Sequence, residues 1–306
     1  MNIPVDKLVG TFKAGAEARR DSDVPVRVAV FVDASASKFL IDCVRGAFVP
    51  QTTAALVRVE RLDGQAPAVK PDTDVSIVIS CGSDGLERAV QQIVVAGAPT
   101  VVLAESSVEA PFIEQDTRML GLIAATDRTY LLETLARWIL DRTDKDIAFS
   151  SNFPFMRIAA AMRAISSVAL TNMATGALAI IPGADFPVMT VAQLGMLLQL
   201  SAIFGKPLRG ERAYEAAGVA AAGLVLRAGA RLACRHAGRL GFVVKALVGG
   251  FGTYAIGRAL VSVYERDVDY SRANKAVGAV WGRVRDLVAG AIGSDGRPVR
   301  GADAAA

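Results

Sequence analysis

The stretch that decides the fold is Ile165–Phe204, which reads ISSVALTNMATGALAIIPGADFPVMTVAQLGMLLQLSAIF and contains Asp185 as its only ionisable side chain. Two apolar arms, Ile165–Ile181 and Val188–Phe204, flank a turn around Asp185. As a helix, each arm of about 17 residues would be about 25 Å long, slightly short of the roughly 30 Å hydrocarbon core of a bilayer. The sequence therefore predicts a helical hairpin that is either the core of a soluble helical domain or a membrane-seeking element.

The chain of 306 residues is long enough for two domains of ordinary size. Hydrophobic residues make up 52% of it but aromatic residues only 6%, so the apolar content is mostly aliphatic and favours helices. Residues 1–150 hold 16 Lys and Arg against 21 Asp and Glu, whereas residues 151–306 hold 18 against 9. The second half is therefore basic as well as apolar, which suits an anionic membrane surface or an acidic partner.

The cysteines and the first residues indicate the compartment. The chain has 3 cysteines, an odd number with wide spacing, so neither a disulfide framework nor a zinc site is predicted. Residues 1–23 carry charges throughout and lack the apolar core of a secretory signal. We therefore expect the protein in the cytoplasm or on the cytoplasmic face of a membrane.

Residues 25–146 alternate between strand and helix patterns, after an N-terminal arm at 1–24. Strands are predicted at Val26–Val32, Ala54–Val59, Asp74–Ser80, Thr100–Ala104 and Met119–Ala124, and helices at Phe39–Phe48, Leu86–Val95 and Tyr130–Arg142, with Asp127 as a cap. This alternation is typical of a doubly wound α/β domain with a mostly parallel sheet.

The pattern changes after residue 146. Residues 147–155 interrupt the alternation and are predicted to be a linker, and 156–290 show no strand signal, which predicts an all-α, apolar helical domain. Helices are expected at about 156–181, 188–204, 211–237, 240–263 and 270–290. The end, 291–306, is rich in Gly, Asp and Ala and is predicted to be a disordered tail.

The element order of 25–146 resembles that of the P-loop GTPases, whose first strand leads into the phosphate-binding motif G-x-x-x-x-G-K-[ST]. The corresponding segment, Val32–Phe39, reads VDASASKF. Aligning Lys38 with the family lysine implies a nucleotide site formed by the loop residues Asp33, Ser35, Ser37 and Lys38.

This segment departs from the family motif at each key position. Val32 and Ser37 replace the glycines that let the backbone approach the phosphates, and Phe39 replaces the hydroxyl that binds magnesium. Asp33 would repel a triphosphate. The guanine-reading Asn-Lys-x-Asp is also missing, because Glu105–Val108 follows the corresponding strand. The resemblance therefore implies a GTPase-like domain that has lost its motifs, with an unrelated doubly wound domain or a working nucleotide hydrolase as alternatives.

Other candidates for chemistry are few. The loop Cys81–Gly85 follows a strand at its carboxyl end, where α/β proteins bind ligands, although turn chemistry explains its Gly, Ser and Asp equally well. His236 is the only histidine and lies among arginines, so no catalytic triad is predicted. Asp185 is either a buried functional carboxylate or a turn residue that caps the next helix.

The segment from Phe155 to about Pro207 resembles a bacterial family known as domain of unknown function 697. The matching features are Asn172, the motif IPGADFP at Ile181–Pro187, and the run Thr190–Gly205. Members often carry a GTPase domain before this helical region, and some are predicted to be inner-membrane proteins. The resemblance therefore implies association with membranes or GTPases, and it implies no reaction.

A basic stripe follows the hairpin. Arg227, Arg231, Arg235 and Arg239 recur every four residues and would lie on one face of a helix. Such a stripe could contact anionic lipid headgroups, or it could be a solvated face that keeps an Ala-rich bundle soluble. Nucleic acid is a poor candidate partner, because no aromatic side chains are interleaved with the arginines.

The sequence as a whole favours a non-enzymatic, membrane-associated adaptor or scaffold on the cytoplasmic side of the inner membrane, peripheral or partly inserted. We expect no metal and no cofactor. The expected partners are the membrane or an anionic lipid surface, a GTPase or a membrane protein, and further copies of the chain. Two alternatives stay open: a nucleotide-binding switch that uses Lys38, and a soluble oligomeric helical interaction protein in the cytoplasm.

Overall fold

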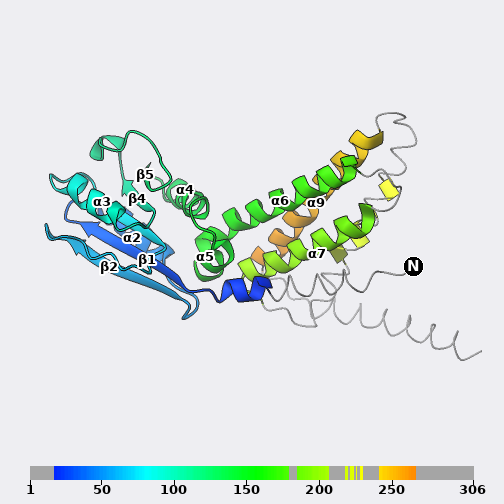
Figure 1. Ribbon diagram of the computed structural model, residues 1–306, viewed down its shortest axis with the longest axis horizontal. Coiled ribbons are helices and arrows are strands. Elements are labelled where there is room, and N and C mark those ends of the chain that lie inside the picture. The colour runs from blue at the N-terminus through cyan, green and yellow to red at the C-terminus, as the bar shows by residue number, and fades with distance from the viewer. Residues whose placement is uncertain are drawn as a thin grey trace, which may run out of the picture.

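The computed structural model describes residues 17–178, 185–206 and 241–266, together with 218, 219, 221–223, 225, 228 and 229. Within these residues an α/β half is followed by a helical half, and the two lie end to end (Figure 1). The two-part layout predicted from the sequence, a mostly parallel α/β domain followed by an apolar helical domain, is confirmed.

The α/β half is built on a five-stranded parallel sheet with the strand order β2-β1-β3-β4-β5. Val28 of the central strand pairs with Val57 on one side and with Val75 on the other. This order is that of a doubly wound sheet whose direction of winding changes between β1 and β3. The strands are β1 (Val26–Asp33), β2 (Ala55–Leu62), β3 (Val75–Ile79), β4 (Thr100–Ala104) and β5 (Leu120–Ala124).

Helices cover both faces of the sheet, which explains the nearly continuous apolar character of its central strands. Alternate side chains of β1, β3 and β4 enter one core with α2 (Lys38–Ala47) and α4 (Arg128–Leu140). The remaining side chains, among them Phe31 and Val78, pack against α3 (Leu86–Val95). The predicted cap of α4 is confirmed, because the Asp127 carboxylate accepts a hydrogen bond from the Tyr130 N–H at 2.7 Å.

The prediction of a linker at 147–155 is wrong. This segment forms the helix α5 (Asp146–Asn152) and the 3-10 turn η2 (Pro154–Met156), and most of it is buried. Its aromatic rings pack against the α/β half, with the Phe48 ring centroid 5.0 Å from that of Phe153. The helix was not predicted because α5 is buried on nearly all sides, and a short helix buried in this way shows no amphipathic period in its sequence.

The helical half consists of α6 (Arg157–Leu178), α7 (Asp185–Ile203) and α9 (Gly241–Glu265), together with short helical pieces between 218 and 229. The expected hairpin is thus present, but α7 begins at Asp185, so its first turn includes residues that were assigned to the turn. The core of α2 and α4 continues through α5 into these helices without a break. The two halves therefore share one hydrophobic core.

Small residues on α9 let it approach α6 closely. A Cβ atom added to Gly249 would lie 2.8 Å from the backbone oxygen of Asn172, and one added to Gly257 would lie 2.6 Å from the Ile165 side chain. Near the other end of α6, a Cβ on Gly176 would lie 2.7 Å from the Lys245 backbone oxygen. Such close contact between backbones is typical of helix pairs with small residues at the interface.

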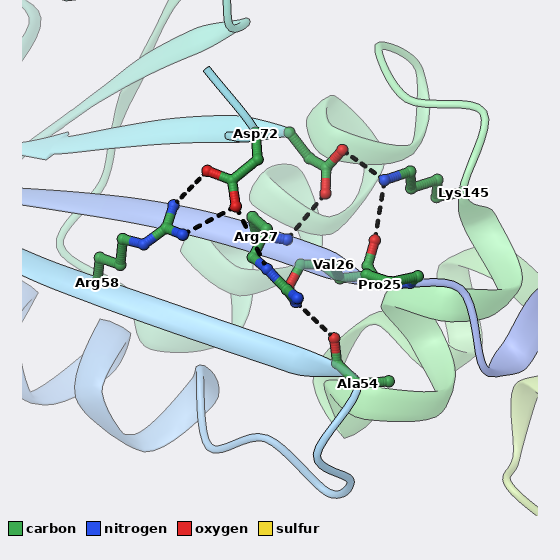
Figure 2. A network of polar contacts seen from close by, with 8 residues as sticks. Pro25, Val26, Arg27, Ala54, Arg58, Asp72 and Lys145 are labelled. Carbon is green, nitrogen blue, oxygen red and sulfur yellow. Dashed lines mark hydrogen bonds and ion pairs between the residues drawn. The ribbon is translucent and has the colours of Figure 1, made fainter. Parts of the chain in front are cut away.

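The amino ends of the strands face the helical half and are held by a polar network (Figure 2). The Arg27 N–H donates to the Asp74 carboxylate at 2.8 Å, and Lys145 Nζ donates to the same carboxylate at 2.7 Å and to the Pro25 carbonyl at 2.9 Å. Asp72 pairs with Arg58 at 2.8 Å. Because this network lies at the amino ends, the carboxyl ends of the strands point away from the helices (Figure 1).

Candidate functional site

The carboxyl ends of β1 and β3 form the crevice at which the sheet changes its winding direction, where doubly wound proteins bind their ligands. The residues predicted for nucleotide binding lie here. Asp33 ends β1, Ser35 and Ser37 lie in the loop that follows, and Lys38 begins α2. The loop Cys81–Gly85 at the end of β3 lies beside them, because the Cys81 N–H donates to Ser35 Oγ at 3.0 Å.

The Asp33 carboxylate is the centre of this crevice. One of its oxygens accepts hydrogen bonds from Ser35 Oγ at 2.5 Å and from Ser80 Oγ at 2.7 Å. The Ser83 hydroxyl and the Ala34 N–H help to stabilise the charge of this carboxylate. Asp33 is only 8% exposed, so these protein groups replace most of the water around its charge.

The hydrogen bonds keep this buried carboxyl ionised. Burial is the largest influence and by itself would raise the pKa of Asp33, but the three serine hydroxyls and the Ala34 N–H stabilise the anion and bring the pKa below its ordinary value. The Asp33 side chain therefore ties the β1–α2 loop to the β3–α3 loop through a charge held by hydroxyl groups. A magnesium ion at Oδ2 would compete with the Ser35 and Ser80 hydroxyls, and a phosphate would meet a negative charge.

The other predicted nucleotide residues serve the start of α2. The Ser37 hydroxyl accepts a hydrogen bond from the Leu40 N–H at 3.3 Å as the N-cap of the helix, and Lys38 is exposed. A polar cavity of about 460 Å³ opens beside Asp33, lined by the β2–β3 loop and the first turns of α3, including Arg88 and Gln92. The described part of the chain holds no cluster of three His, Cys, Asp or Glu side chains suited to a metal.

The helical half carries a second candidate site, a region without charge. No Asp, Glu, Lys, Arg or His lies in Ala164–Leu178 of α6, Val188–Ile203 of α7 or Ala246–Gly257 of α9. At 1.5 Å per residue these stretches are roughly 18–24 Å long, which is shorter than a bilayer core. Arg163 on α6 and Arg258 on α9 border these stretches. The two arginines lie at the same height along the helices, because Arg258 contacts Met162, the neighbour of Arg163 (Nη1 to Sδ, 3.2 Å).

A buried amide–hydroxyl cluster, formed by Asn172, Gln193 and Thr253, joins the three helices inside this region. The Asn172 and Gln193 amides both donate to Thr253 Oγ1, at 2.8 and 3.0 Å, and the Thr253 hydroxyl donates to the Gly249 carbonyl at 2.7 Å. All three side chains are at least nine-tenths buried. Among the described residues, Asn172 Oδ1 has no hydrogen-bond partner.

The outer face of α9 is apolar and exposed. Phe242–Glu265 is the one described helix that is long and apolar enough to cross a membrane. Leu247, Phe251, Tyr254 and Arg258 follow one another at spacings of four, three and four residues and share one face. Phe251 is 66% exposed and Leu247 44%. We call Leu247, Phe251 and Tyr254 the α9 row.

Several predicted contact residues cannot be placed. The basic stripe, Arg227, Arg231, Arg235 and Arg239, lies outside the described residues, as do most of the helices expected at 211–237 and 270–290 and the tail at 291–306. For Asp185 only the backbone is described.

Sequence reasoning missed Ser80 and Thr253. The signal available for Ser80 was its position at the carboxyl end of a strand. No sequence pattern indicated that Thr253 contacts Asn172.

No protein-family model, curated protein or solved structure matches this chain. The resemblances to domain of unknown function 697 and to the P-loop GTPases therefore stay predictions.

Proposed function

We propose that the protein is a non-enzymatic, membrane-associated adaptor whose helical half contacts the bilayer and whose α/β half presents a surface to a partner. The observation that carries this proposal is the exposed α9 row within a region that has no charge on three helices. Large exposed apolar side chains in one region are typical of membrane or protein contact sites.

The dimensions support shallow insertion rather than a span. Lys245 and Arg258 bound the apolar part of α9 and are about 20 Å apart along the helix axis. A bilayer core of roughly 30 Å would place one of these charges in hydrocarbon, at a cost of about 3 kcal/mol. A bundle that inserts only its exposed face leaves both cations at the level of the headgroups.

The polar side chains of the helices are compatible with lipid contact. On the exposed face of α6, the Thr171 and Thr175 hydroxyls donate to the carbonyls of Ser167 and Thr171, at 2.9 and 2.8 Å. Hydroxyls bonded to their own helix do not need water, so they can enter a membrane interface at low cost.

The orientation of the sheet supports an adaptor with two ends. The α/β half is fixed to the helices through the shared core and the Lys145 network, and its crevice opens on the opposite side. Contact of the α9 row with a membrane would therefore leave the Asp33 crevice, at the far side of the α/β half, free for a partner. The partner expected there is a GTPase or a membrane protein, as the family resemblance implies.

The first prediction concerns membrane binding. The variant Phe251→Asp places a charge in the α9 row and should weaken binding to vesicles of phosphatidylcholine and phosphatidylglycerol in equal amounts by about tenfold or more, because a carboxylate is costly in the acyl region. The measurement is vesicle flotation at low salt.

The matched control is Val95→Asp, which adds the same charge at a valine on α3 that is 86% exposed and far from the α9 row. It should bind vesicles as well as the unchanged protein. If the unchanged protein stays entirely in the soluble fraction, the membrane proposal is wrong and the soluble oligomeric alternative is favoured.

A second prediction concerns nucleotide. Because Asp33 carries a negative charge in the crevice and its Oδ2 already accepts from two hydroxyls, GTP with magnesium should not raise the thermal midpoint of the protein, and Lys38→Ala should behave like the unchanged protein in isothermal titration. Lys70→Ala, at an exposed lysine of the β2–β3 loop, is the control. Micromolar binding that is lost only in Lys38→Ala would establish the nucleotide switch instead.

A further inference from the structure

The edge strand β2 has an unpaired outer side. In the described sheet it pairs only with β1, and its eight residues are about 26 Å long. No backbone hydrogen bond outside the sheet ladder involves 55–62 within the described part of the chain. Its sequence, ALVRVERL, contains no proline and no lysine, although it carries the charges of Arg58, Glu60 and Arg61.

This edge also exposes large apolar side chains. Val59, in the middle of the strand, is 69% exposed, and Leu56 is 44% exposed. An edge strand with free backbone groups and exposed aliphatic side chains is a template for the addition of another strand.

The charges of β2 indicate which strand fits. If a second copy of β2 pairs antiparallel about a two-fold axis at Val59, Arg58 lies opposite Glu60 of the partner subunit, and the reverse pair forms on the other side of the axis. Leu56 then lies opposite Leu62 of the partner subunit. An axis at Arg58 or at Glu60 would instead place two like charges directly opposite each other, which is unfavourable.

We propose that β2 binds β2 of a second copy of this chain in this register and so joins the two sheets into one. Contacts within the subunit hold both side chains in place, because the Arg58 guanidinium donates two bonds of 2.8 Å to Asp72 and Glu60 accepts a bond from the Ala68 N–H at 3.3 Å. The pairing is isologous and closed, so it gives a dimer and not a fibre. It does not depend on the membrane proposal.

Disulfide trapping of the full chain tests the register. In a background in which Cys43, Cys81 and Cys234 are replaced, Val59→Cys places two thiols directly opposite each other, within reach of a disulfide. In Val57→Cys the two thiols are about 13 Å apart along the strands. Val59→Cys should form disulfide-linked dimer at least about tenfold faster than Val57→Cys, and equal rates would overturn the proposed register.

Charge exchange tests the same contact without a covalent bond. Arg58→Glu and Glu60→Arg each place like charges opposite each other in the homodimer, so each variant alone should be a monomer by light scattering. Mixed together they restore both opposite-charge pairs and should form a heterodimer. A monomeric unchanged protein, or dimers that persist in both single variants, would show that β2 is not the interface. Circular dichroism of each variant confirms that it is folded.

Discussion

Thr253→Val should lower the free energy of unfolding by about 2–4 kcal/mol, although valine has nearly the shape of threonine. The change removes the oxygen that accepts from the Asn172 and Gln193 amides, and both donors are left buried and unpaired. Each unsatisfied buried group costs about 1–3 kcal/mol. The measurement is denaturant unfolding followed by far-ultraviolet circular dichroism.

Thr171→Val is the matched control, because Thr171 is an exposed threonine on α6 whose hydroxyl bonds only to its own helix. It should change the free energy of unfolding by about 0.5 kcal/mol or less. Asn172→Leu should cost less than Thr253→Val, since it removes an amide whose oxygen already lacks a partner. Equal stability of Thr253→Val and Thr171→Val would show that the cluster does not hold the helices together.

Asp33→Asn should destabilise the α/β half by about 2–4 kcal/mol at neutral pH. The amide removes the charge that accepts from Ser35 and Ser80 and directs a donor toward groups that also donate. Each hydrogen bond to a charged group contributes about 1.5–3 kcal/mol. The expected loss is less than the sum of these bonds, because the amide oxygen of asparagine can still accept a hydrogen bond. Asp84→Asn, at an exposed aspartate of the adjacent loop, should have little effect.

The effect of Asp33→Asn should depend on pH in one direction. The pKa of Asp33 is lower in the folded protein than its ordinary value, so the folded state binds fewer protons at this group than the unfolded state does. The stabilisation is therefore fully present above the unfolded pKa of about 3.9 and decreases as the pH falls through the folded pKa. Urea unfolding at pH 7 and at pH 3 should show the difference between the two proteins shrinking, and a constant difference would contradict the assignment.

The sequence predicted most elements because their patterns are local. Thr100–Ala104 and Leu86–Val95 were predicted at their observed bounds, since a continuous apolar run and a clear helical period need no knowledge of the rest of the chain. The Asp127 cap could be predicted for the same reason, because its acceptor and donor are three residues apart.

The candidate sites were only partly predictable. Asp33 was identified, but as a residue near phosphates, because its partner Ser80 is 47 positions away and only the parallel pairing of β1 and β3 brings the two together. The free edge of β2, with its exposed Val59, was not predicted for the same reason, because it also depends on contacts between distant strands. The strand pattern was recognised, but its position at the border of the sheet follows from the winding order.

The sequence alone determined a doubly wound α/β domain joined to an apolar, helical and charge-poor domain, because composition and period are set within short windows. The tertiary structure decided what lies between and across them: that 147–155 is core and not linker, that Asn172, Gln193 and Thr253 meet, and that the crevice opens away from the helical half. These arrangements depend on contacts between residues far apart in the chain, whose energies come from burial and pairing in three dimensions and leave no local pattern.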